Sequence, residues 1–160
     1  MRILGIDPGL ANVGWGVLDK ENSRHMYVQD GTVITRSSMP LKDRIKLISD
    51  ELGMVIDRFR PNVASIEDIY FAKNKKTAIR VAEARGAIIL TLALKNINFY
   101  EYTPTQVKNS ISGFGRLEKH QVKYMISKLL GMKPDFNFNS DHSSDALALA
   151  VCHGNNHQFL

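Results

Sequence analysis

Apolar residues form short continuous or alternating runs in five segments of the chain, and recur every three or four positions in five others. The first pattern is typical of strands and the second of helices. The predicted strands span residues 2–7, 13–18, 25–35, 62–67 and 98–102. The predicted helices span about 41–59, 77–95, 104–112, 118–130 and 141–153.

The order of these elements predicts the fold class. Three strands in succession predict an antiparallel meander, and strands that follow helices predict parallel crossovers. Together they indicate an α/β fold in which helices cover both faces of a mixed five-stranded sheet. The sequence has no internal repeat, linker or low-complexity tract, so we expect one domain over residues 1–160.

Turn and capping residues lie where these elements should begin and end. Asp7-Pro8-Gly9 is typical of a turn, so the first two strands should form a hairpin. Thr103-Pro104-Thr105-Gln106 has the form of a capping box at the start of a helix. The glycines of the second strand suit either close backbone packing or the passage of a bound group.

Four polar residues lie at element ends that can meet in space. Asp7 and Glu67 close the first and fourth strands, and His142 and Asp145 share one face at the start of the last helix. In a mixed sheet, the ends of the first and fourth strands can be neighbours. The resulting acidic pocket with one imidazole would suit hard divalent cations, as in enzymes that cut phosphodiesters.

Each of these residues also has a simpler structural interpretation. Asp7 before Pro-Gly is typical of an Asx turn, and Glu67 at a strand end is commonly only solvated. His142 and Asp145 can be ordinary first-turn residues, the acid being favoured by the helix dipole. The joint pattern favours a metal site, because clustered carboxylates repel each other unless cations neutralise them. Two divalent ions about 4 Å apart could orient water for in-line attack on phosphorus without a covalent intermediate.

Composition changes this picture only slightly. The net charge of +5 favours an acidic partner such as nucleic acid, and a hydrophobic content of 44% is ordinary for a soluble globular protein. The single cysteine, Cys152, excludes an internal disulfide. No apolar run approaches the roughly 20 residues of a membrane span, and Asp7 interrupts the N-terminal run before a leader could form. We expect a cytoplasmic protein without membrane association.

A set of motifs extends over nearly the whole chain. They are Ile3-Leu4-Gly5-Ile6-Asp7-Pro8-Gly9, Gly14-Trp15-Gly16-Val17, Ile66-Glu67-Asp68-Ile69-Tyr70-Phe71-Ala72-Lys73-Asn74, Ala84-Arg85-Gly86, Gln106-Val107-Lys108, Gly113-Phe114-Gly115, Glu118-Lys119-His120-Gln121-Val122 and Asp145-Ala146-Leu147-Ala148-Leu149-Ala150. In combination they resemble RuvC, the family of bacterial Holliday junction resolvases. The resemblance implies a ribonuclease H-like fold and a homodimer that cuts four-way DNA junctions in recombination and repair.

The same resemblance implies further properties of the reaction. Each subunit would nick one of two opposing strands and leave a 5′ phosphate and a 3′ hydroxyl. Two nicks require two active sites that face one junction, so the dimer would be part of the mechanism. The RuvA–RuvB branch-migration complex is the partner that the family implies.

The metal ligands are also implied by the resemblance. The family's four metal-binding positions map onto Asp7, Glu67, His142 and Asp145, which would hold Mg²⁺ or Mn²⁺, two ions in each active site. Many members carry Asp where this chain has His142, and others carry His. The nitrogen donor makes manganese more favourable relative to magnesium. Asp141 is a rival for this position, but the family's spacing selects His142. That leaves Asp141, beside Ser140, as a candidate cap of the last helix.

Several residues match family positions that lie close to DNA, or are near such positions. They are Tyr70, Phe71, Lys73, Lys75, Lys76, Lys108 and Lys119, with Arg80, Arg85 and Arg116 as further candidates. The ring of Tyr70 could stack on an unpaired base at the crossover, or could simply anchor its loop. Lys108 and Lys119 match basic positions near the active site, and Lys119 would also act in catalysis. The neighbouring lysine run could bind phosphates, although such runs are most often solvated.

The helix over 77–95 is rich in alanine and contains Gly86, so another element can approach it closely. The small residues suit packing on the sheet and a dimer contact equally well.

Three other functions remain open from the sequence. They are a related nuclease for RNA–DNA hybrids, a non-catalytic junction-binding module, and an actin-like ATPase, for which the chain is too short to form the usual two lobes.

Overall fold

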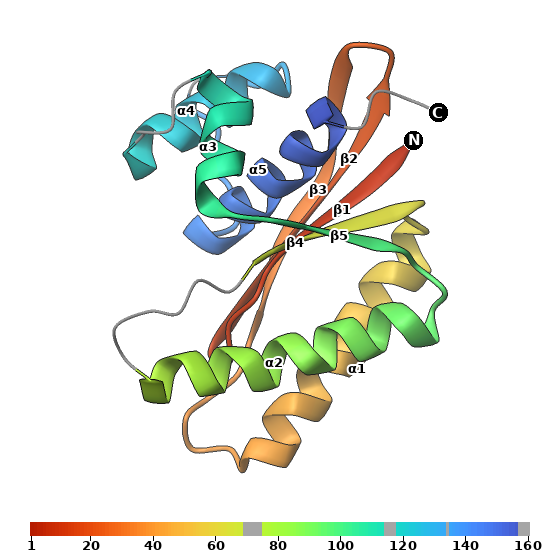
Figure 1. Ribbon diagram of the computed structural model, residues 1–160, viewed down its shortest axis with the longest axis vertical. Helices are drawn as coiled ribbons and strands as arrows, with labels where there is room; N and C mark the ends of the chain where they lie inside the picture. The colour runs from red at the N-terminus through yellow and green to blue at the C-terminus, as the bar shows by residue number, and fades with distance from the viewer. Residues whose placement is uncertain (69–74, 114–117, 134, 157–160) are drawn as a thin grey trace.

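The computed structural model describes residues 1–68, 75–113, 118–133 and 135–156, and a five-stranded sheet runs through its middle (Figure 1). The strands are β1 (Arg2–Asp7), β2 (Asn12–Glu21), β3 (Arg24–Ile34), β4 (Val63–Glu67) and β5 (Phe99–Tyr102). Their order across the sheet is β3-β2-β1-β4-β5. The first three strands are antiparallel neighbours, and β4 runs parallel to β1 and β5. The predicted meander and parallel crossovers are therefore confirmed.

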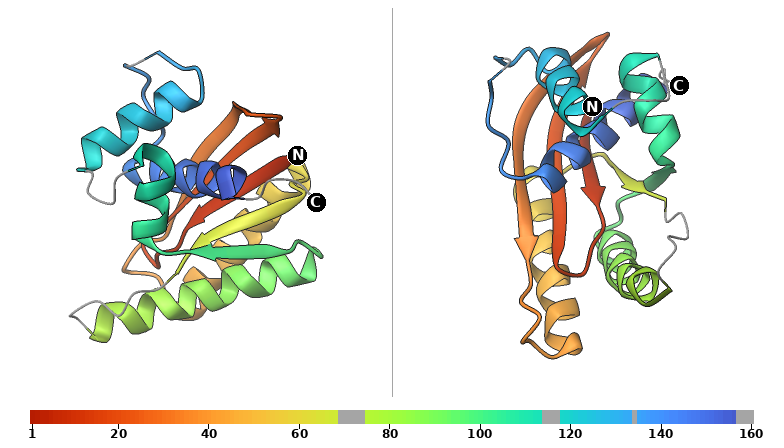
Figure 2. Two further views of the ribbon diagram at one scale, coloured as in Figure 1. Left: turned by 45° about the horizontal axis from the view of Figure 1, so that its top comes forward. Right: turned by 90° about the vertical axis from the view of Figure 1, so that its left-hand side faces the viewer.

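Helices cover both faces of this sheet, as predicted. They are α1 (Leu41–Phe59), α2 (Lys75–Leu94), α3 (Pro104–Ser112), α4 (Lys119–Leu129) and α5 (Asp141–Asn156). The helices α1 and α2 pack on one face, and α5 lies across the other face with α3 and α4 outside it (Figures 1 and 2). The capping box predicted for α3 is present, because Thr103 and Gln106 bond reciprocally.

The alternation of side chains along β1 divides the core into two clusters. Leu4 and Ile6 pack with Leu52 of α1, whereas Ile3 packs with Leu147 of α5. Because successive side chains of a strand point to opposite faces, Asp7 faces α5 like Ile3. The residue that ends the strand is thereby directed toward the last helix.

Glycines let α5 lie directly on the backbone of β1 and β2. A Cβ atom at Gly5 would be 1.8 Å from the carbonyl oxygen of Ala146, and one at Gly14 would be 2.0 Å from that of His142. A Cβ at Gly16 would be 2.5 Å from Cγ of Leu147. Close packing is therefore the role of the glycines of β2. The contact sets the height of the first turn of α5 above the strands.

Some boundaries differ from the sequence prediction. The β2–β3 ladder continues through charged residues as far as the pair Glu21 and Arg24, where apolar alternation gives no signal. The helix α2 begins at 75 rather than 77. Ser140, not Asp141, caps α5: its Oγ accepts from the backbone N–H of Ser143 at 3.0 Å. The carboxylate of Asp141 forms an ion pair with Lys123 of α4 instead.

Candidate active site

Asp7 and Glu67 lie at the ends of two adjacent parallel strands. Ile6 of β1 is opposite Ile66 of β4, so the two acids follow side by side at the same edge of the sheet. In β4, Val63 packs in the core cluster beneath α5, and the period of two directs Glu67 to that face as well. The strand order and register thus bring together two carboxylates that are distant in the sequence.

The first turn of α5 brings His142 to these strand ends. Its Nδ1 lies 2.7 Å from Oδ2 of Asp7, with the side chain of Asp7 14% exposed and that of His142 45% exposed. An N–H at this nitrogen donates to the carboxylate and orients the ring. Asp145 follows one turn later on the same side of the helix.

The electrostatics of Glu67 reflect all three neighbours. Burial, together with the negative charges of Asp7 and Asp145, raises the pKa of Glu67 to about 7, although His142 opposes the shift. A carboxyl group held in this way resists ionisation near neutral pH. A bound cation would relieve this cost, because it would neutralise the charges that oppose ionisation.

The chemistry of these donors suits a divalent cation. Oxygen ligands with one imidazole nitrogen are typical of Mg²⁺ and Mn²⁺ sites. Within the described residues, however, no three such side chains already surround one metal-sized position. His142 bonds to Asp7, so its ring and the carboxylates would need to adjust around an ion.

A small cavity of about 160 Å³ lies beside the acids. It is lined by Asp7, Glu67, Pro104, Val107, Lys108, Val122, Asp145, Ala148 and Leu149. Lys108 is the cation among these lining residues, so one wall of the cavity is basic and another is acidic. That combination suits a phosphate group that must approach both a metal site and a positive side chain.

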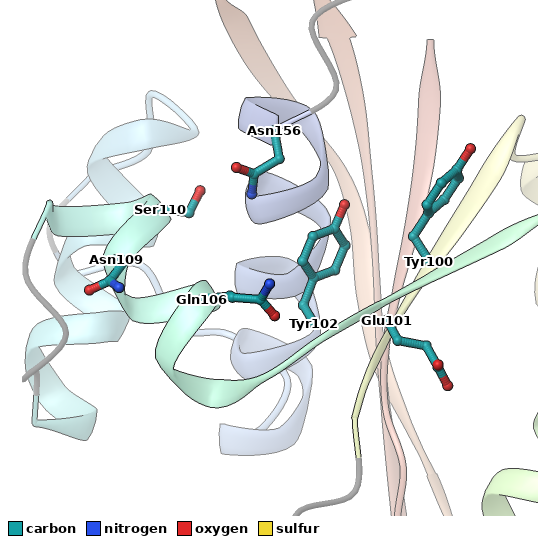
Figure 3. A pocket seen from close by; sticks show the side chains of 7 residues that line it. All are labelled: Tyr100, Glu101, Tyr102, Gln106, Asn109, Ser110 and Asn156. Carbon is teal, nitrogen blue, oxygen red and sulfur yellow. The ribbon is translucent and has the colours of Figure 1, made fainter.

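A larger pocket of about 610 Å³ lies elsewhere, between β5, α3 and the end of α5 (Figure 3). It is lined by Tyr100, Glu101, Tyr102, Gln106, Asn109, Ser110 and Asn156. Its lining holds one carboxylate among amides and hydroxyls. Volume alone would favour this pocket, but the clustered carboxylates and the raised pKa of Glu67 favour the smaller cavity as the reactive site.

Comparison with known proteins decides the family. The family model described as "Crossover junction endodeoxyribonuclease RuvC" matches residues 3–153. The chain belongs to the RuvC family. The resemblance inferred from the motifs is therefore confirmed, and the chain is a nuclease of the crossover junction endodeoxyribonuclease class.

Individual RuvC proteins are similar over nearly their full length. One from Borrelia turicatae (strain 91E135) is 78% identical, covering 98% of this chain and 98% of that protein. One from Caldicellulosiruptor saccharolyticus is 45% identical, covering 96% and 92%. A structure described as "T. thermophilus RuvC in complex with Holliday junction substrate" has a TM-score of 0.89 at 32% identity, covering 96% and 92%. These similarities confirm the ribonuclease H-like fold and do not favour the alternative functions.

The RuvC residues expected to contact DNA are only partly described. Tyr70, Phe71, Lys73 and Arg116 lie outside the described residues. Lys75 and Lys76 begin α2, and Lys119 begins α4. For these three lysines the structure describes the backbone but not the side chains. Lys108 lies at the small cavity. Arg80 and Arg85 form ion pairs with Glu83 and Glu101.

One acidic residue near the site was not singled out from the sequence. Asp30 of β3 is 6% exposed and accepts a hydrogen bond from the hydroxyl of Ser143, next to His142. The signal in the sequence is an acid in the middle of a predicted strand. That signal is weak, because its partners Ser143 and Asn139 lie more than one hundred positions away.

Within the described part of the chain, none of the helices combines the length and the apolar content that a membrane span requires.

Proposed function

We propose that Asp7, Glu67, His142 and Asp145 form the metal site with which this RuvC-family nuclease resolves Holliday junctions. The 2.7 Å contact between His142 and Asp7 carries the proposal, because it joins the last helix to the strand that bears the first acid. The raised pKa of Glu67 supports it, since burial and then the charges of Asp7 and Asp145 oppose its ionisation, which a solvated and isolated acid would not experience.

The four side chains would share one task. Oxygens of Asp7, Glu67 and Asp145 and a ring nitrogen of His142 would hold Mg²⁺ or Mn²⁺, two ions in each active site. Such ions activate water for attack on phosphorus and stabilise the leaving 3′ oxygen. Glu67 would bind as the carboxylate, so ion binding would release the proton that its raised pKa retains.

Basic residues would position the scissile phosphate. Lys108 lies at the cavity that the acids border, and Lys119 begins α4, where the helix dipole disfavours a cation unless an anion is near. Lys119 would act in catalysis by stabilising charge on the phosphate. Tyr70, Phe71 and the lysines at 73, 75 and 76 would contact the junction near its crossover.

The reaction requires two nicks, so we propose a homodimer that presents two active sites to one junction. Ala84 and Ile88 of α2 are buried against the sheet, whereas Leu90 and Leu94 on its outer side are 58% and 72% exposed. Gly86 also opens to free space. An exposed apolar strip beside a small residue suits close contact with the same helix of a second copy.

The products would carry 5′ phosphates and 3′ hydroxyls, and RuvA–RuvB would be the partner complex. The net charge of +5 supports binding to DNA.

We place the protein in the cytoplasm, consistent with the buried free thiol of Cys152. We treat residues 1–160 as one functional domain.

A substrate comparison tests this proposal. A labelled four-way junction and an RNA–DNA hybrid duplex are incubated side by side with the wild-type protein and Mn²⁺. We expect paired nicks on opposing strands of the junction, which ligase can seal, and no cutting of the hybrid. Preferential cutting of the hybrid, or nicks that ligase cannot seal, would contradict it.

A further inference from the structure

A buried carboxylate on β3 faces the start of α5. Asp30 is opposite Gly16 in the β2–β3 ladder, and Thr32 is opposite Gly14. Since those glycines lie beneath α5, Asp30 and Thr32 flank the same helix from the next strand. Asp30 is 6% exposed, and a carboxylate taken out of water is costly unless donors surround it.

Three donors meet this carboxylate. Its Oδ2 accepts from the hydroxyl of Ser143 at 2.5 Å and from the backbone N–H of Asn139 at 2.8 Å. Its Oδ1 accepts from the hydroxyl of Tyr27 at 2.6 Å. The first two donors lie on either side of the point where α5 begins. Asp30 thereby ties the loop before the helix and the first turn of the helix to one atom of β3.

A second link reinforces the first. The hydroxyls of Thr32 and Ser140 are 2.5 Å apart, and Ser140 and Ser143 bond reciprocally through backbone N–H and side-chain oxygen at 3.0 and 2.9 Å. The helix cap and the strand therefore form one continuous network. Hydroxyl groups that are shared between a cap and a buried acid have little freedom to rotate.

This network surrounds His142 in the sequence. Ser143 follows it directly, and the capping Ser140 comes two positions before it. The glycines beneath α5 set the height of the helix but present no side chain that could stop it from sliding or turning. The bonds from β3 supply a restraint at this end of the helix, next to His142 and two positions before Asp145.

We propose that Asp30 is a positioning residue, which holds the first turn of α5 so that His142 and Asp145 meet Asp7 and Glu67 around a divalent cation. The inference rests on the proposed function of those four side chains. Partners that orient metal ligands from outside the coordination sphere typically change metal affinity or activity by about 10- to 100-fold when removed. Asp30 does not bond to a metal ligand itself; it acts on the ligands through the start of α5.

Two substitutions at Asp30 separate its hydrogen bonds from its charge. Asp30→Ala removes every acceptor. Asp30→Asn can place its amide oxygen toward Ser143 and Asn139, while its NH₂ donates to the oxygen of Tyr27, whose hydroxyl hydrogen can rotate away. We expect Asp30→Ala to lower the cleavage rate about 10-fold with junction affinity unchanged within about twofold, and Asp30→Asn to restore most of the rate.

A readout without cleavage follows the metal ligand itself. Mn²⁺ broadens the NMR signals of a nearby imidazole, so a titration of the free protein measures how readily His142 meets the ion. We expect Asp30→Ala to require about 10-fold more Mn²⁺ than the wild type for half-broadening of the His142 signal. Asp30→Asn should resemble the wild type in this titration.

The matched control lowers stability on the other face of the sheet. Ile48 and Leu52 belong to α1 and are fully buried. The control is Ile48→Val or Leu52→Ala, whichever lowers Tm by the same amount as Asp30→Ala. The control should keep the wild-type rate and Mn²⁺ titration. Equal losses in the control, wild-type behaviour of Asp30→Ala, or failure of Asp30→Asn would each overturn the inference. A wild-type protein whose His142 signal ignores Mn²⁺ would instead overturn the proposed metal site.

Discussion

Nδ1 of His142 lies 2.7 Å from Oδ2 of Asp7, although 135 positions separate the two residues in the chain. The contact joins the only imidazole proposed as a ligand to the acid at the end of β1. His142→Ala should therefore lower junction cleavage by at least about 100-fold while junction binding survives, because a ligand and the partner of Asp7 are lost together. Cleavage rate and binding by gel shift are measured in parallel.

Asp141→Ala is the matched control for that substitution. Asp141 pairs with Lys123 across α4 and α5, and its side chain is 59% exposed, so its loss should cost at most about 1 kcal/mol of stability. Most of the cleavage activity should remain. Full activity in His142→Ala, or a greater loss in Asp141→Ala than in His142→Ala, would remove His142 from the site.

The metal preference should depend on the same position. His142→Asp replaces a nitrogen donor by a carboxylate, and all-oxygen sites favour the harder ion. We expect the ratio of the cleavage rate in Mg²⁺ to the rate in Mn²⁺ to rise severalfold. Rates at saturating metal are compared for both proteins, and an unchanged ratio would show that the imidazole does not set the preference.

The sequence predicted the element order because its signals are local. The apolar alternation of β1, the helical stripe of α1 and the capping box at Thr103 each lie within a few residues. The end of β2 was missed because charged residues such as Lys20 continue the ladder there, and packing rather than polarity determines the length of the strand. Lys20 is buried despite its charge.

Some residues of the candidate site could likewise be predicted from local signals in the sequence, and others could not. Asp7 and Glu67 could be found because strand ends are visible in the apolar pattern and parallel strands align them. Asp30 could not be found, since its significance depends on Ser143 and Asn139, which reach it only after α5 crosses the sheet. The role of Gly5 in this crossing is likewise evident only from the position of Ala146 above it.

The contact between Gly5 and α5 can be tested by adding one methyl group. In Gly5→Ala the new Cβ would be 1.8 Å from the carbonyl oxygen of Ala146, so the helix must lift away from the strand. We expect a loss of about 3 kcal/mol in the free energy of unfolding, measured by urea denaturation.

Gly53→Ala in α1 is the control for Gly5→Ala. Its new Cβ would meet only Cε of Lys95, at 3.8 Å, which is ordinary contact. Alanine is the better helix former, so stability should rise by about 0.5–1 kcal/mol. If Gly5→Ala were as stable as Gly53→Ala, α5 would not lie on the backbone of β1.

The pH dependence of stability should contain a contribution from His25. Burial, with a smaller effect of Lys20, lowers the pKa of His25 to about 4, whereas the unfolded chain has the ordinary value of about 6.5. Between these values the unfolded state binds more protons. The contribution is therefore complete above about pH 6.5 and is lost as the pH falls through 4, by at most about 3 kcal/mol.

His25→Leu removes this titration. The difference in unfolding free energy between the wild type and His25→Leu should fall as the pH is lowered from 7 to 4, in favour of the variant. Ile48→Val, which removes no ionisable group, is the control, and its difference from the wild type should change little over the same range. A pH-independent difference for His25→Leu would mean that the ring is not buried in its neutral form.

The central claim is that the four converging side chains form a metal-dependent site for junction cleavage. A Mn²⁺ titration of junction cleavage, with wild type and Asp7→Asn compared and junction binding followed in each, tests it most directly. We expect wild-type cleavage to require the ion and saturate with it, and Asp7→Asn to bind the junction normally without cutting it at any Mn²⁺ concentration. Cleavage without a divalent ion, or cleavage by Asp7→Asn at the wild-type rate, would contradict the claim.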